Sequence, residues 1–160
     1  MSNLDELAAL ARTGAAFIRV AGREKRPVGM AWQTRATDDL EVVEGWLRAG
    51  ANVGLLLGAG GLIDVECDDG DADDEIDALG LPTTVSWSSA RGAHRLYRIA
   101  EPLPDRAAVK AGMLEVRIVG RAAQSVLPPS IHPTGVAYRW TAPPPAVEVA
   151  EITLADLLVG

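Results

Sequence analysis

The stretch Leu55-Leu56-Leu57-Gly58-Ala59-Gly60-Gly61-Leu62-Ile63-Asp64-Val65-Glu66 joins two short apolar runs through three glycines and ends in two acids. Glycines between apolar runs are typical of a turn, so residues 51–57 and 62–66 are expected to form a β-hairpin. Residues i and i+2 of a strand point to the same side, with Cα atoms roughly 7 Å apart. Asp64 and Glu66 are therefore expected to project their carboxylates into one space, while Val65 turns into the core.

Two neighbouring carboxylates disfavour each other's ionisation, and a divalent cation would remove that cost. Hard oxygen ligands suit Mg²⁺ or Mn²⁺, and phosphoryl or nucleotidyl transfer is a typical use of such a site. Two other interpretations stay open at this point. A solvated strand end leading into an acidic loop explains the spacing equally well. A calcium loop starting at Asp64 also has acids at suitable positions, although Asp69 stands where an EF-hand requires glycine.

Length and composition indicate a globular domain in a reducing compartment. The chain has 160 residues, 48% of them hydrophobic, enough to bury about two-thirds of its surface. No apolar run approaches the roughly 18–20 residues of a membrane span, and the N-terminus lacks a signal-peptide pattern. The single cysteine, Cys67, excludes an internal disulfide and a Cys-rich zinc site. We therefore expect a cytoplasmic protein with no membrane partner and no zinc.

The net charge of −7 is distributed unevenly. Residues 64–77 hold nine acids and no base, whereas residues 91–121 hold seven bases and three acids. Salt screens distant charges over about 8–10 Å, so a local basic surface can bind phosphates on an acidic protein. The overall charge therefore does not exclude a nucleic-acid partner.

Apolar periodicity and turn residues predict an α+β fold with a mixed, largely antiparallel central sheet and flanking helices. Few of the connections are long enough for a βαβ crossover. Helices are expected at residues 4–12, 37–50, 104–111 and 152–158. Besides the hairpin, strands are expected at residues 15–20, 83–88, 93–99, 114–119, 124–127 and 136–140, with a stiff proline linker at 143–145.

Several polar residues could bind phosphates or metal beside the two acids. His94 follows a turn that contains Ser89, Arg91 and Gly92, and hydroxyls, backbone N–H groups and arginine are what a triphosphate needs. A hydrogen-bonded core histidine is the structural alternative for His94. Glu115 could be a third metal carboxylate with Arg117 beside it, although a half-buried strand with one wet face explains the alternation of residues 113–118 completely.

Other motifs limit the possible functions. The glycines at 58–61 precede a strand, which does not fit a dinucleotide-binding fingerprint, and no P-loop (GxxxxGK[ST]) occurs. His132, in Pro128-Pro129-Ser130-Ile131-His132-Pro133, is typical of a rigid structural corner. The chain has only seven aromatic residues, so few can stack on bases. Trp32, Trp87 and Trp140 are the candidates, and we expect weak template affinity in isolation.

The order of these motifs resembles the primase–polymerase (Prim-Pol) domains of the archaeo-eukaryotic primase superfamily, found in phage and plasmid replication proteins. The resemblance extends from about Phe17 to Trp140. The matching segments are Lys25-Arg26-Pro27, Trp32, Ala51-Asn52-Val53-Gly54, Asp64-Val65-Glu66, the turn ending at His94, Glu115, Pro128 to Gly135, and Tyr138-Arg139-Trp140. The third acid is more often Asp in the family, and the turn before the histidine is usually richer in glycine.

The resemblance implies an RRM-like palm with an N-terminal α/β lobe, and a catalytic domain over residues 1–141 followed by a linker and short helix over 142–160. It implies that Asp64, Glu66 and Glu115 hold two Mg²⁺ or Mn²⁺ ions. His94 with Ser89 and Arg91 would orient the triphosphate, and Lys25 and Arg117 are further candidates for phosphate contact.

The function so implied is DNA-dependent nucleotidyl transfer from (d)NTPs to a primer 3′-hydroxyl or an initiating nucleotide. The partners would be a single-stranded DNA template, a primer and a replicative helicase on the same or another chain, in the cytoplasm of a bacterial host. Two alternatives remain. The same acids could serve a metal-dependent nuclease or phosphodiesterase, or the chain could be a catalytically decayed module that binds nucleotide or template.

Overall fold

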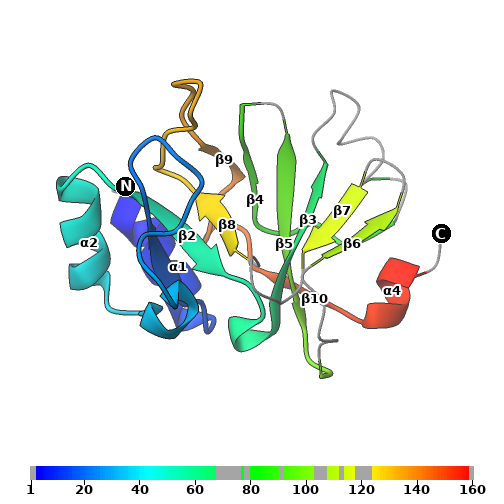
Figure 1. Ribbon diagram of the computed structural model, residues 1–160. Helices are drawn as coiled ribbons and strands as arrows, with labels where there is room; N and C mark the ends of the chain where they lie inside the picture. The colour runs from blue at the N-terminus through cyan, green and yellow to red at the C-terminus, as the bar shows by residue number, and fades with distance from the viewer. Residues whose placement is uncertain are drawn as a thin grey trace.

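A computed structural model shows an α+β fold in which the chain alternates between two β-sheets (Figure 1). It describes residues 3–67, 77, 80–90, 92–102, 108–111, 114–117 and 124–158. The helices are α1 (Asn3–Arg12), α2 (Leu40–Arg48) and α4 (Leu154–Leu158), with 3-10 turns η1 (Trp32–Arg35) and η2 (Ala59–Gly61). Among the described helices, none is long and apolar enough to cross a membrane.

The smaller sheet has the order β1-β2-β8, formed by β1 (Phe17–Val20), β2 (Asn52–Leu56) and β8 (Gln124–Leu127). All its pairings are antiparallel. Helices α1 and α2 lie at this end of the molecule (Figure 1). Helix α2 begins at Leu40, three residues after the predicted start, where the side chain of Asp39 accepts a hydrogen bond from the backbone N–H of Glu41.

The larger sheet has the order β6-β7-β3-β5-β4-β9, with β10 pairing with β5 outside this path. Its strands are β3 (Leu62–Cys67), β4 (Ser86–Ser88), β5 (Ala93–Ile99), β6 (Ala108–Ala111), β7 (Leu114–Arg117), β9 (Arg139–Ala142) and β10 (Ala150–Ile152). Only β10 runs parallel to its partner among the described strands. The predicted mixed, largely antiparallel α+β fold is confirmed.

One core lies between the sheets. Phe17 and Leu55 of the smaller sheet are buried in the same apolar cluster as Leu62, Trp87 and Leu96 of the larger sheet. Helices α1 and α2 add buried residues to this cluster from the outer side of the smaller sheet. Burial of apolar side chains from both sheets at one interface holds the sheets together. A residue at this interface is shielded from water by both sheets.

The predicted hairpin over residues 51–57 and 62–66 is wrong. Strand β2 pairs with β1 and β8, whereas β3 pairs with β5 and β7. The glycines around η2 carry the chain from one sheet to the other: Gly58, Gly60 and Gly61 have φ of 92°, 67° and 76°. Three turn positions of this kind change the direction of the chain without folding it back onto itself.

Other elements also differ from the predictions. Residues 108–111 form strand β6 in place of the end of a helix, because their pairing with β7 outweighs local helix propensity; residues 104–107 lie outside the described part. The last predicted strand, 136–140, is displaced to Arg139–Ala142. Strand β10 is absent from the sequence prediction, and the C-terminal helix begins at Leu154 in place of residue 152.

Replacing Gly61 by alanine is expected to lower the free energy of unfolding by at least about 2 kcal/mol. The left-handed backbone at this position disfavours a Cβ, and the added Cβ would force neighbouring backbone to move. A Cβ on Gly61 would lie 2.5 Å from the carbonyl oxygen of Ile99. Gly45→Ala is the matched control: its Cβ would meet nothing within 4 Å in helix α2, and the change should stabilise by about 0.5–1 kcal/mol. Urea unfolding of both variants measures the difference, and equal midpoints would contradict the role given to Gly61.

Candidate metal centre between the two sheets

Asp64 and Glu66 project from one face of β3, as their spacing predicts. Asp64 is fully buried, and Glu66 is 8% exposed. The interpretation of these acids as a solvated strand end is therefore wrong. Val65 is also fully buried, so β3 is covered on both faces, and its acids occupy a place that normally holds apolar side chains. Burial of two carboxylates raises the cost of leaving them without a compensating positive charge.

His94 lies against both acids. Strand β5 pairs with β3 in antiparallel register, with His94 opposite Glu66. The imidazole Nδ1 is 2.7 Å from Asp64 Oδ2 and 3.1 Å from Glu66 Oε2. With an N–H at Nδ1, the ring donates to these carboxylates, and a protonated imidazolium would offset their mutual repulsion.

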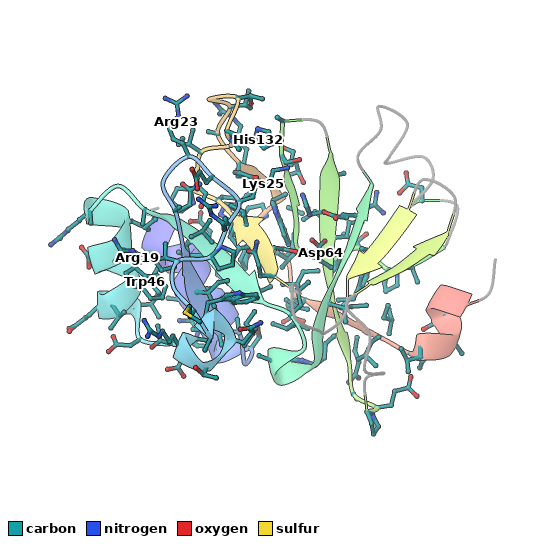
Figure 2. All side chains as sticks on the ribbon, in the orientation of Figure 1. Arg19, Arg23, Lys25, Trp46, Asp64 and His132 are labelled. Atoms are coloured by element: carbon teal, nitrogen blue, oxygen red, sulfur yellow. The ribbon has the colours of Figure 1, made fainter. Side chains whose placement is uncertain are left out.

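Two further contacts position this cluster. The indole of Trp87 on β4 stacks on the His94 ring, with centroids 5.0 Å apart and planes at 3°. The hydroxyl of Ser125, on β8 of the smaller sheet, donates to Asp64 Oδ2 over 2.6 Å. Because Asp64 and Ser125 belong to different sheets, the cluster lies where the sheets meet. Figure 2 shows Asp64 in this position.

The three side chains fit a divalent cation. One ligand atom each from Asp64, Glu66 and His94 lie within 4.8 Å of one another. Asp64 Oδ2 accepts from Ser125 and contacts His94, while the buried Oδ1 has no hydrogen-bond partner among the residues that the structure describes. An orphaned carboxylate oxygen beside a second carboxylate is a suitable pair of donors for Mg²⁺ or Mn²⁺, and the imidazole lies against both acids. This cluster could therefore bind a metal ion.

The position of the expected third acid is defined by its backbone. Strand β7 pairs with β3 on the side opposite β5, and the register sets Glu115 against Glu66 and Arg117 against Asp64. Glu66 is thus flanked in the sheet by His94 on one strand and Glu115 on the other. The side chains of Glu115 and Arg117 lie outside the described part of the structure, so their roles stay predictions.

Ser89 and Lys25 are the described members of the remaining residues predicted to contact phosphate. Ser89 closes the β4–β5 turn, where its hydroxyl accepts from the backbone N–H of Gly92 over 3.1 Å. Arg91 lies outside the described residues. Lys25 is exposed, and its backbone carbonyl accepts from the side chain of Gln124 over 2.8 Å. Gln124 belongs to β8, so this hydrogen bond holds the backbone of the Lys25 segment against that strand.

Sequence reasoning missed Ser125 and misassigned Trp87. Ser125 interrupts an apolar strand, but only the packing of the two sheets directs its hydroxyl at Asp64. The prediction that Trp87 is a base-stacking platform does not fit its position. It is fully buried and its indole N–H donates to the carbonyl of Val126 over 3.0 Å, so its ring supports His94 and does not reach a base.

Comparison with known proteins yields one family. The family model described as "Bifunctional DNA primase/polymerase, N-terminal" (Prim-Pol) matches residues 6–154 of the 160-residue chain. The matched range includes both sheets and every residue of the buried cluster. A search of curated proteins finds no match.

Proposed function

Because the chain belongs to the Prim-Pol family, we propose that it is a DNA-dependent primase/polymerase that acts in phage or plasmid replication. It would transfer nucleotidyl groups from (d)NTPs to a primer 3′-hydroxyl or an initiating nucleotide, on a single-stranded template and beside a replicative helicase. In this reaction the hydroxyl oxygen bonds to the α-phosphorus, the bond to pyrophosphate breaks, and the hydroxyl proton passes to solvent. The observation that carries the proposal is the buried cluster of Asp64, Glu66 and His94.

The proposal gives the acids the role of metal ligands. Asp64 and Glu66, joined by Glu115 from the neighbouring strand, would hold the cations, with His94 beside them. Bound Mg²⁺ or Mn²⁺ would supply charge stabilisation for the attacking and leaving oxygens. What the chain itself contributes is a rigid strand geometry: β3 and β5 hold the ligand atoms in register, and the Ser125 hydroxyl restrains the Asp64 carboxylate.

His94 would serve the triphosphate as well as the acids. A protonated imidazole carries N–H groups on both ring nitrogens. Its Nδ1 contacts the carboxylates, and in the protonated ring the second N–H is suited to a phosphate oxygen. Ser89, Arg91, Lys25 and Arg117 would add phosphate contacts from the surrounding segments. The fastening of the Lys25 backbone to Gln124 supports its place at the edge of this site.

The wild-type protein tests the proposal directly. With a labelled primer–template, Mn²⁺ or Mg²⁺ and nucleoside triphosphates, we expect longer products; without triphosphates the labelled DNA should stay intact. Shortening of the DNA by metal alone would instead indicate a nuclease, in which water replaces the 3′-hydroxyl. Triphosphate binding by calorimetry, with no product under either metal, would identify a catalytically decayed module. Either result would overturn the proposed synthesis.

A further inference from the structure

A cavity lies beside helix α2, away from the acid cluster. It encloses about 190 Å³ and is lined by Arg19, Val28, Trp32, Arg35 and Trp46. In Figure 2, Arg19 and Trp46 lie together on the α2 side of the molecule, whereas Asp64 lies centrally between the sheets. None of these lining residues contributes to the buried cluster of Asp64, Glu66 and His94.

Three different elements bring the lining residues together. Arg19 is the exposed residue of β1 between the buried Ile18 and Val20. Its carbonyl accepts from the backbone N–H of Val28 over 2.9 Å, which holds the returning loop against the strand. Trp32 enters from η1 and Trp46 from α2, and both are half-buried against the core. Each indole is therefore held in place by packing while part of it faces the cavity.

The cavity belongs to a basic segment of an acidic protein. Residues 19–35 contain five basic residues and one acid, in a chain of net charge −7. The one acid, Glu24, is 3.3 Å from Arg26. Among the residues that the structure describes, Arg19 and Arg35 make no hydrogen bond or ion pair with a carboxylate. Two guanidinium groups without carboxylate partners create a local positive potential, and this potential attracts a polyanion.

Indole and guanidinium side chains together suit one class of ligand. Aromatic faces stack on nucleobases without regard to sequence, and arginine binds phosphates and stacks on bases. The exposed apolar side chains of Val28 and Met30, at 40% and 87%, adjoin the same loop. We propose that the pocket of Arg19, Trp32, Arg35 and Trp46 binds single-stranded DNA; that the strand is the template rests on the proposed function.

The loop also leads from this pocket to strand β8. Residues 21–26 form a turn closed by the hydrogen bond from the Ala21 N–H to the Arg26 carbonyl, of 3.0 Å. At this turn the Lys25 carbonyl is bound by Gln124, the neighbour of Ser125. A strand held at the pocket could continue along this basic turn, where Arg23 and Lys25 are exposed.

The test is binding of a labelled oligo(dT) by fluorescence anisotropy, without metal or triphosphate. The double variant Arg19→Ala/Arg35→Ala should weaken binding roughly tenfold and reduce the slope of log affinity against log salt by about 1.4, or about 0.7 for each phosphate that an arginine no longer neutralises. Arg48→Ala is the matched control, because Arg48 is an exposed arginine of α2 that pairs with Glu44 and does not line the cavity. It should leave both quantities close to wild type.

Two further measurements separate stacking from charge. Arg19→Lys/Arg35→Lys should restore the salt slope, because the charge is retained. An abasic oligonucleotide of equal length and charge should bind wild type more weakly, because it offers no face to the indoles. The proposal would be overturned if wild type showed no detectable binding at low salt, which is also the result expected of a pocket for a protein partner. It would also be overturned if wild type and the Arg19→Ala/Arg35→Ala variant bound with equal affinity. Binding is measured without catalysis, so the binding result can be interpreted even if the protein does not extend a primer.

Discussion

Replacing Asp64 by asparagine is expected to lower primer extension by at least about a hundredfold, because the cluster would lose a buried anionic ligand from the site of charge stabilisation. Asparagine has almost the same shape, so it can still accept a hydrogen bond from Ser125. It cannot supply a second carboxylate oxygen to a cation. The readout is extension of a labelled primer with Mn²⁺ or Mg²⁺, at equal protein concentration.

The controls for this prediction concern folding and metal binding. Asp38→Asn removes the same charge from an exposed position before α2 and should leave extension unchanged. Mn²⁺ should raise the melting temperature of wild type but not of Asp64→Asn, because a ligand stabilises only the state that binds it. Primer extension within a few-fold of wild type would contradict the assignment of Asp64 to the metal site. If Asp64→Asn does not fold, Glu66→Gln tests the same site in the same assay.

Replacing Trp87 by alanine should lower the free energy of unfolding by about 3–5 kcal/mol, the usual cost of removing a large buried aromatic side chain. Trp87 is fully buried, packs edge-on against Trp140 with ring centroids 5.9 Å apart, and joins the sheets through its hydrogen bond to Val126. Small domains are stable by only about 5–15 kcal/mol. A loss of this size should therefore be visible in urea unfolding as a large shift of the midpoint.

Two other substitutions show which part of Trp87 is responsible. Trp87→Phe keeps a ring against His94 but leaves the Val126 carbonyl without its donor, at a cost of about 1–3 kcal/mol. Met30→Ala, at a side chain that is 87% exposed, should change stability by no more than about 0.5 kcal/mol. An alanine variant of Trp87 as stable as Met30→Ala would show that the two sheets do not depend on this residue.

Local sequence patterns predicted the elements whose signals are local. Apolar periodicity predicted helix α2, and the turn that contains Gly92 separated the two segments that form β4 and β5. The hairpin was wrong because glycines indicate that the chain turns, but not which strand it then pairs with. Strand β6 was missed for the same kind of reason: its partner β7 determines its conformation, and propensity alone favoured a helix.

The buried cluster divides in the same way between local and distant information. The pairing of Asp64 with Glu66 on one face depends only on the two-residue period of a strand. Their contact with His94 depends on the register of β3 against β5, over a sequence separation of about thirty residues, and turn residues do not specify that register. The Ser125 hydroxyl and the pocket of Arg19, Trp32, Arg35 and Trp46 depend on packing between elements that no local pattern relates.

The sequence by itself determined the α+β class, the acid pair of β3, the family resemblance and the basic character of the loop at residues 22–27. Each of these depends on residue type and short-range spacing, and both are properties of the chain before it folds. Only the tertiary structure decided that the acids are buried, that an imidazole contacts both, and that two sheets enclose them. Strand register and sheet packing arise from many distant contacts acting together, so they exist only once the core between the sheets has formed.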